Sequence, residues 1–531
     1  MAHMIWDYAG TPEPTRYMTE DEVKGAKAKQ YFQLFFTPDV MQHILDETNG
    51  YANRQRVQNP QKHRSKWYDV SMPELEIFLG MTLLMGIIRL PTYHMYFQTE
   101  HKLLATNIAD PMARGRFLQI KRYLHVADET VADPDDKLRK VRPLLDLVTP
   151  HFAEEYVMDQ ETAIDEAMIP YKGRLNIKQY MSAKPTKWGI KVWCLNEDRT
   201  GYGWRLQVYT GAGADGVPET NQATRVVLDL MFGLGDQGYH LYTDNLYTSP
   251  ILASILQQNH ICTCGTIRVY PHPRRYFQRE IVVTKNEAKR LDRGNYVWRT
   301  NGPQVAMRWM DKKPVYLLST IQPPHLGNDQ LPNVRRFARD GEAQLIPAPP
   351  AEVEYVTNMR GVDRADQKIQ LYNAVRKSVK WWKRVFYYLI EVSINNGHII
   401  ETKQRQKYDI KTRSILDFKV SLAEELIDGR SVRKKKGRFS GDDVNEARLD
   451  NTGHMPVHSG DQHDCKVCNS KKIATQHHGD VRPKNSGPGC TYFTERHRTQ
   501  VRCEKCDVAL CMSKDRNCFR LYHIYTRYWE H

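Results

Sequence analysis

Apolar positions recur every three to four residues between about residues 31 and 160, which is the spacing of amphipathic helices. Ser71 and Glu74 form a capping box around an early proline and announce one of these helices. Another helix is expected at 114–126. The segment 31–160 is therefore predicted to be all-α. Residues 1–30 before it are polar and contain two prolines, and we predict a flexible N-terminus there.

The period of the pattern changes to two in residues 161–267, as expected for strands. The predicted order is three strands, a helix, a strand, a helix and a strand, at 163–169, 188–195, 203–211, 224–232, 240–243, 250–258 and 260–267. This βββαβαβ order is the layout of an α/β RNase H-like nuclease core. Such a core needs one more helix.

The missing helix is predicted late in the chain, within residues 351–371, and starts near Asp363. Residues 268–350 hold turns, strand-like pieces and several prolines, and we predict that they form a β-rich insertion in the core. The alternative is a separate β domain, with Asp363 unrelated to the core.

Residues 372–430 are predicted to be helical again. Five apolar side chains recur there at helical spacing and should pack inward: Trp382, Phe386, Leu389, Ile390 and Ile394. Aromatic residues at such spacing are typical of a core, so Trp381 and Trp382 are interpreted as structural rather than as base-stacking groups. A basic linker is predicted at 431–460. Its run SVRKKKGRFSGDD is either a nuclear localisation signal or a phosphate-binding tether.

Four aspartates are the candidate catalytic residues. Asp244 follows the buried strand at 240–243, and an acid at the end of such a strand is costly unless it binds something. Asp165 lies inside another apolar strand. Asp363 and Asp366 are three residues apart and therefore share one face of a helix.

Carboxylates at these positions suit phosphodiester cleavage. The reaction needs an in-line nucleophile and stabilisation of the attacking and leaving oxygens, which two Mg²⁺ (or Mn²⁺) ions about 3.5–4 Å apart supply. We expect Asp165 to bridge both ions, Asp244 to bind one and Asp363 the other. Asp366 would be a ligand or would hold a metal-bound water. Water would be the first nucleophile and a 3′-hydroxyl the later one, and the crowded acids should be poorly stable without cations.

The charge of the chain favours a polyanionic partner over a merely basic enzyme, because 77 Lys and Arg face 62 Asp and Glu. Residues 371–440 alone hold 17 basic and 7 acidic residues. We predict binding to double-stranded DNA that weakens steeply with salt. For any single basic residue a solvated helix face is about as plausible as a DNA contact. The candidate contacts are Arg116, Lys121, Arg122, Lys137, Arg139, Lys140, Arg142, Lys377, Lys380, Lys383 and Arg384.

Seven of the 10 cysteines lie within residues 465–531. Two CxxC pairs indicate structural zinc in a reducing compartment rather than disulfides. Seven ligands are evident, namely Cys465, Cys468, Cys503, Cys506, Cys511, Cys518 and His523. Two tetrahedral Zn²⁺ sites need an eighth, which is one of His454, His463, His477, His478, Cys490 or His497. We expect Cys503 and Cys506 to share one ion with Cys518 and His523.

From about residue 31 to 523 the chain resembles the piggyBac family of DDE/D transposases. The matching pieces occur in one order: MTLLMG, DKLRKVRPLLD, IDEAMIPYKGR, KPTKWGIKV, YTDNLYTS, CGTIR, KKPVYLLST, MRGVDRADQ, KSVKWWKR and CDVALC…CFRLYH. The resemblance implies that Asp165, Asp244 and Asp363 are the catalytic acids and that Asp366 supports them. It also implies cut-and-paste movement at TTAA sites through hairpinned ends.

The same resemblance implies that the two helical segments, 31–160 and 372–430, form one split domain for DNA binding and dimerisation. A cysteine-rich domain at 461–531 would grip the transposon ends. Two features depart from the family. The 34 residues between the CxxC pairs are more than expected, which leaves the fourth ligand of the first zinc site open, and His454 lies where some relatives carry a histidine. The acidic N-terminal tail is also absent, and the first residues, MAHM, resemble a cloning remnant, which is consistent with truncation.

Other function classes remain as alternatives. A domesticated, non-catalytic DNA-binding protein would keep the fold and lose the need for Asp244. A zinc module acting as a ubiquitin ligase or histone reader would explain residues 465–531 but neither the acids nor the basic helices. An RNase H-class nuclease or resolvase would cut without strand transfer. We expect a homodimer in the nucleus, no small-molecule substrate and no membrane partner, because the longest apolar run, 77–88, is too short to span a bilayer.

Overall fold

The computed structural model describes residues 6–63, 66–98, 107–182, 184–211, 219–267, 291–324, 331–337, 341–374, 378–432, 449, 453–469, 497–513 and 516–525. The chain forms two compact units, Met1–Arg433 and Lys434–His531. Within the described residues, no helix is both long enough and apolar enough to cross a membrane.

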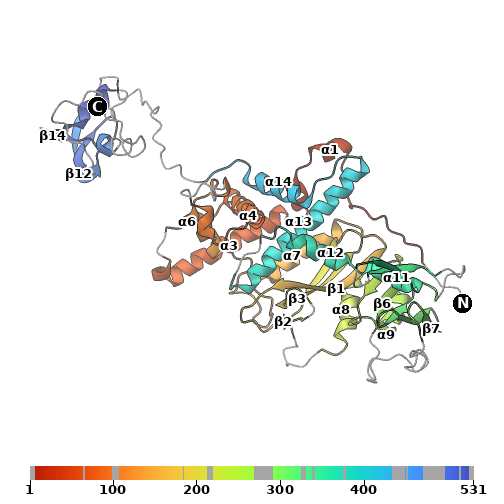
Figure 1. The fold of residues 1–531 in the computed structure, drawn as a ribbon. Coiled ribbons are helices and arrows are strands. Elements are labelled where there is room, and N and C mark those ends of the chain that lie inside the picture. Colours follow the sequence, from red (N-terminus) through yellow and green to blue (C-terminus); the bar gives the residue numbers. More distant parts are fainter. Residues whose placement is uncertain are drawn as a thin grey trace. The chain divides into compact units, whose positions relative to one another are not determined.

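A nine-stranded mixed sheet is the centre of the first unit (Figure 1). Strand β1 pairs antiparallel with β3 and parallel with β5, and β5 pairs parallel with β6. The parallel part is covered on both faces, so all four residues of β5 are buried. The strands are β1 (Glu161–Pro170), β2 (Lys178–Tyr180), β3 (Trp188–Glu197), β4 (Gly203–Val208), β5 (His240–Thr243), β6 (Cys262–Thr266), β7 (Tyr296–Asn301), β8 (Gln304–Met310) and β9 (Pro314–Ser319).

Helices cover this sheet on its two sides. Figure 1 shows α12 (Gly361–Gln370) on one side and α8 (Gln222–Met231) and α9 (Pro250–Gln258) on the other. Helix α11 (Pro350–Asn358) packs on β6, β9 and β1. The predicted order of strands and helices from β1 to β6 is found. One element is additional: the short edge strand β2, which pairs with β3 and which no apolar alternation indicated.

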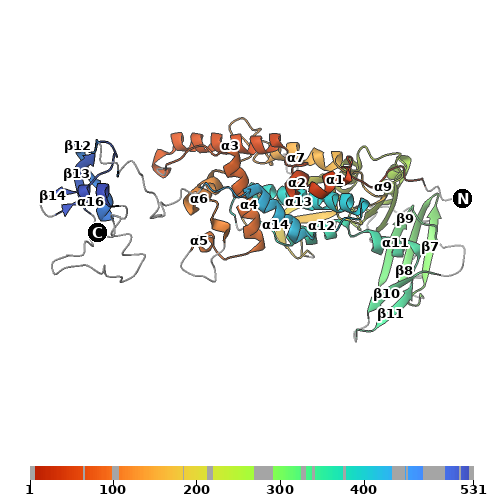
Figure 2. The ribbon, with the colours of Figure 1, turned by 90° about the horizontal axis from the view of Figure 1, so that it is seen from above.

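Strands β7, β8 and β9 extend the same sheet beyond β6. Cys264 of β6 lies opposite Ser319 of β9, so these strands are not a separate β domain. A two-stranded sheet of β10 (Asn333–Phe337) and β11 (Ala343–Pro347) lies beyond them (Figure 2). Much of the first part of the predicted insertion, 268–290, lies outside the described residues.

Two stretches far apart in the sequence build the helical part. The long helix α13 (Trp381–Lys407) contacts α7, α2 and α12, and α14 (Ile415–Ile427) packs on α4. All five side chains of the predicted stripe on α13 are buried. The other helices here are α1 (Glu20–Gly25), α2 (Ala28–Phe32), α3 (Pro38–Gln58), α4 (Met72–Ile87), α5 (Tyr93–Tyr96), α6 (Arg114–Tyr123) and α7 (Arg142–Glu154), with single 3-10 turns at Pro60–Lys62 and Asn107–Ala109.

The prediction of a flexible N-terminus does not fit residues 6–30. Backbone hydrogen bonds join Ala9 N to Gln237 O (3.1 Å) and Val157 N to Glu13 O (3.0 Å). The Tyr408 hydroxyl donates to Met18 O at 2.8 Å. This segment therefore packs along both the sheet part and the helical part, through these backbone bonds and through buried side chains such as Val23.

The second unit is small. Strands β12 (Pro456–Asp464) and β13 (Arg498–Cys503) form a hairpin, β14 (Met512–Ser513) pairs with β15 (Arg516–Asn517), and α16 (Cys518–Ile524) follows. Its buried core consists mainly of cysteines, together with Val467, Leu510 and Tyr522. Most of the predicted linker lies outside the described residues, and its last residues belong to β12.

Candidate active site and metal centres

Two of the four aspartates lie side by side on parallel strands. Ile164 of β1 is in register with Thr243 of β5, so Asp165 and Asp244 occupy the next matching position. Neighbouring strands are about 4.8 Å apart, so the two residues lie next to each other where β5 ends. Asp244 also closes the turn after β5, because its Oδ1 accepts from Leu246 N at 2.8 Å.

The other two aspartates come from α12, which packs across β1 and β3. Two close approaches seat this helix. A Cβ on Gly361 would lie 2.9 Å from Glu197 O, and Gly201 (φ +76°) meets Ala365 N in the same way. Hydrogen bonds fix the helix further, since Lys368 Nζ donates to Thr200 O at 2.9 Å. Only glycine at these positions allows the helix to approach so closely.

The charges of these acids affect one another's pKa values. Burial, with the charges of Asp363 and Asp165, raises the pKa of Asp366 to about 7 against the opposing charge of Lys184. Burial also raises the pKa of Glu166 to about 7, helped by its hydrogen bond and charge interaction with Asp165. The structure therefore brings all four predicted acids into one site, with Glu166 beside them.

The donors fit magnesium in kind, because they are hard carboxylate oxygens. Among the described residues, no three acids have oxygens that all lie within 4.8 Å of one another. Two oxygens on one Mg²⁺ lie within about 4.2 Å, whereas ligands of two ions about 3.5–4 Å apart lie farther away.

Lys184 is a member of the site that the sequence did not single out. Its Nζ lies 2.8 Å from Asp165 Oδ2, and it comes from the loop between β2 and β3. Glu166 was likewise missed. Both lie inside the matching pieces IDEAMIPYKGR and KPTKWGIKV, but neither has a spacing that marks it as functional.

The predicted basic contacts fall into different environments. Arg122 is exposed, and Lys121, Lys137, Arg139, Lys140, Arg142, Lys380 and Arg384 are partly buried. Several of them have partners within the protein: Lys140 pairs with Glu129 (2.9 Å) and Arg142 with Asp136 (2.9 Å). Arg139 Nη1 donates to Pro134 O (3.2 Å), and Arg384 Nε donates to Pro170 O (2.6 Å). Lys377 lies outside the described residues.

Arg116 does not fit the prediction of a DNA contact. It is 7% exposed, and its guanidinium donates two hydrogen bonds, of 2.8 and 2.7 Å, to the carboxylate of Glu74. Its Nη1 donates to Tyr68 O, and Nη2 donates to Asp69 O as well as to Glu74. These bonds hold the guanidinium inside the protein, where Arg116 joins α6 to α4.

Lys383 does not fit that prediction either. It is 6% exposed, its Nζ donates to Lys121 O, and the ring of Trp382 lies 5.3 Å away. Burial lowers the pKa of Lys383 to about 7, and the charges of Lys380 and Lys121 add to the shift. A buried lysine whose ammonium already donates to Lys121 O is poorly placed to contact a phosphate.

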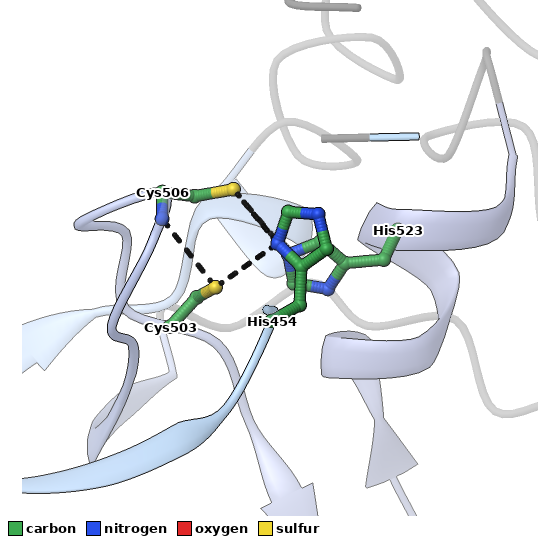
Figure 3. A group of neighbouring side chains, drawn as sticks. All are labelled: His454, Cys503, Cys506 and His523. Atoms are coloured by element: carbon green, nitrogen blue, oxygen red, sulfur yellow. Dashed lines mark hydrogen bonds between the residues drawn. The ribbon is translucent and has the colours of Figure 1, made fainter. Parts of the chain in front are cut away.

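The cysteines and histidines of the second unit form two groups of four. In the first group (Figure 3), His454 Nδ1 lies 3.5 Å from Cys503 Sγ and 3.4 Å from Cys506 Sγ, and His523 Nε2 lies 3.5 Å from Cys506 Sγ. Tetrahedral zinc with bonds of about 2.3 Å to sulfur and 2.0–2.1 Å to nitrogen places sulfur and nitrogen about 3.5 Å apart. These distances fit Zn²⁺. His523 Nδ1 is oriented by Phe519 O at 2.7 Å, as a metal-bound histidine requires.

The second group consists of Cys465, Cys468, Cys511 and Cys518, all buried. Cys468 Sγ lies 3.9 Å from Cys511 Sγ and 3.7 Å from Cys518 Sγ, close to the separation of about 3.8 Å in a tetrahedral zinc–sulfur site. The two sites interleave along the chain. The expected pairing of Cys518 with Cys503, Cys506 and His523 was wrong, because His454 takes that place and Cys518 starts α16 on the other side of the helix turn from His523.

Comparison with known proteins gives a consistent result. A family model described as Transposase IS4 matches residues 27–398. The human PiggyBac transposable element-derived protein 2 is 25% identical over 448 residues, which cover 83% of this chain and 72% of that protein. The human PiggyBac transposable element-derived protein 3 is 26% identical over 491 residues, covering 91% and 74%.

A solved structure has a similar fold. It is the piggyBac transposase synaptic complex with hairpin DNA, determined by cryo-electron microscopy. It aligns with 96% of this chain and 100% of its own chain, at a TM-score of 0.65 and 20% sequence identity.

Proposed function

The chain belongs to the piggyBac-type transposase family, and we propose that it is an active cut-and-paste DNA transposase. It binds the terminal repeats of its element, excises the element through hairpin ends and integrates it at TTAA sites. The observation that carries this proposal is the acidic site. Asp165 and Asp244 hold matching positions on neighbouring strands, and α12 brings Asp363 and Asp366 to them.

The acids have separate roles in this proposal. Asp165 is central, since it touches Lys184 and influences Glu166 and Asp366. It would share two Mg²⁺ ions, with Asp244 on one and Asp363 on the other. Bound there, the ions would stabilise the attacking and leaving oxygens of the phosphodiester. Asp366 lies one helical turn after Asp363 on α12 and would help to orient the other ligands.

The proposal extends to the rest of the chain. The second unit holds two Zn²⁺ ions, which stabilise a fold with little apolar core, and it binds the transposon ends. Two ends processed symmetrically call for a homodimer. Work on chromosomal DNA calls for a nuclear location, and the basic run near residue 435 supplies a candidate signal.

The test is excision in cells of a reporter interrupted by the element's own terminal repeats. The wild-type chain should restore the reporter with a single TTAA, and Asp244→Ala should abolish this. The matched control is Asp146→Ala, an exposed aspartate on α7, which should excise normally.

A second function has support in the human relatives, which are named as transposable element-derived proteins. It is a domesticated DNA-binding role without catalysis. Wild-type protein that binds authentic ends but never excises them, in cells or with purified protein and Mn²⁺, would establish that role and refute the proposed activity.

A further inference from the structure

Lys184 forms an ion pair with one of the candidate catalytic acids. Its Nζ lies 2.8 Å from Asp165 Oδ2, and the two side chains are 21% and 16% exposed. Whereas Asp165 lies within β1, Lys184 comes from the loop between β2 and β3. Its four-carbon side chain can therefore move its ammonium by several ångströms without moving the sheet.

The ammonium acts on the whole acidic site rather than on one partner. Burial opposes its charge, yet Asp165, Asp363 and Glu166 together raise the pKa of Lys184. In turn Lys184 opposes the rise in the pKa of Asp366. The ion pair thus places one positive charge directly on the carboxylate that would bind both ions.

A divalent cation at Asp165 would compete with this ammonium, because both need the same carboxylate and repel each other. Cleavage also brings a phosphate into the site, and a phosphate offers a new anionic partner at the mouth of the loop. Building on the proposed transposase activity, we propose that Lys184 exchanges partners. It neutralises Asp165 in the resting enzyme, and it contacts a non-bridging oxygen of the phosphate being cut when metal and DNA are bound.

The test is Lys184→Met, which keeps the length of the side chain and removes its charge. Binding of Mn²⁺ to the DNA-free protein should tighten by about 5–10-fold, because a competing cation is gone. Single-turnover cleavage of a repeat end at saturating Mn²⁺ should fall by about 10²-fold, as when one transition-state donor is lost. Affinity for the uncut end should stay within about twofold, since one of many phosphate contacts is removed.

These two effects have opposite signs, and a structural role would not produce them. If Lys184 only held Asp165 in position, Lys184→Met would weaken both Mn²⁺ binding and cleavage, and that result would overturn the proposal. Unchanged cleavage would overturn it as well. Lys184→Arg should restore the weaker Mn²⁺ binding and recover part of the cleavage rate. Lys187→Met, an exposed lysine on the same loop, should change neither quantity.

The proposed function and this proposal fail in different ways. Wild-type protein that never cleaves authentic ends refutes the transposase activity. The Mn²⁺ titration is independent of cleavage: tighter binding in Lys184→Met supports the competition at Asp165, and equal or weaker binding overturns it. Circular dichroism and thermal unfolding of each variant confirm that the comparison is between folded proteins.

Discussion

Replacing Lys383 by methionine separates burial from DNA binding. The Lys383 ammonium is 6% exposed and lies near two other cations, Lys380 and Lys121, which is why burial and like charge lower its pKa from 10.5 to about 7. The unfolded chain keeps the ordinary value. Between pH 7 and pH 10.5 the unfolded state therefore binds more protons than the folded state, and stability rises with pH in this window.

The magnitude follows from the shift. One pKa unit corresponds to about 1.36 kcal/mol, so the charged form of Lys383 costs up to about 5 kcal/mol below pH 7 and about 2 kcal/mol at pH 9. Methionine avoids this cost at every pH. It also loses the hydrogen bond from Nζ to Lys121 O, which costs about 1–2 kcal/mol at every pH. The gain in stability from Lys383→Met should therefore shrink by about 3 kcal/mol from pH 6 to pH 9.

Thermal unfolding of the full chain, followed by tryptophan fluorescence, measures this change. With about 2.1 cal/mol/K per residue, 3 kcal/mol corresponds to about 3 °C for a unit of this size. The Tm of the variant minus that of wild type should fall by about this amount between pH 6 and pH 9. The exposed Lys411→Met should show no such trend. A difference in Tm that does not change with pH would refute the burial argument.

Binding to the terminal repeats gives the second half of the same test. Removing a real phosphate contact lowers the slope of log affinity against log salt by about one. Lys383→Met should leave the slope unchanged, because its side chain does not reach the surface. A reduced slope would show that Lys383 contacts DNA after all.

Three further outcomes are expected. Elemental analysis should find two zinc ions per chain in wild type and one in Cys465→Ser; one ion in wild type would contradict this. A chelator should unfold the second unit and leave the Tm of the first unit unchanged. Gly361→Ala should lower cleavage by about 10²-fold while DNA binding persists, because its methyl would meet Glu197 O at 2.9 Å and shift α12; full activity would show that the helix can yield. Burial raises the pKa of Glu352 to about 7 against the charge of Arg336. The folded state therefore holds a proton that the unfolded state has lost, and the free energy of unfolding should fall as pH rises from about 4.5 to 7. In urea unfolding, Glu352→Gln should lack this fall.

The sheet and its acids could be predicted because their signals are local. A buried strand shows as a short apolar run, and an acid at its end stands out against it, as Asp244 does after β5. Helical spacing alone placed Asp363 and Asp366 on one face. Strand β2 has three residues and no alternation, so it gave no such signal.

The basic residues could not be sorted in this way. Arg116 and Arg122 lie on the same helix and look alike in the sequence, yet one is buried and the other exposed. The difference is Glu74, 42 positions away, which accepts both guanidinium bonds. Spacing along α6 contains no information about a partner on α4. Charge patterns therefore indicate the kind of partner a protein has, but not which residues touch it.

The zinc ligands show the same boundary between local and distant information. Each CxxC pair is a local turn, and the sequence identified both. Which pairs share an ion depends on how the hairpin of β12 and β13 folds back, since Pro456 lies opposite Cys503. That pairing brings His454, two residues before the strand, to the second CxxC pair. The eighth ligand is thus set by strand register rather than by its distance from any cysteine.

Helix α13 joins the helical part of the first unit to the strands that carry the candidate catalytic acids. Its Tyr388 hydroxyl lies 3.7 Å from Cys194 Sγ, and Cys194 is the residue opposite Asp165 in the sheet. Arg384, one turn earlier, donates to Pro170 O at the end of β1. A helix that carries basic residues at its start is therefore fixed to the strand that holds the central acid. A DNA contact near Lys380 would therefore act on the position of Asp165 through packed side chains.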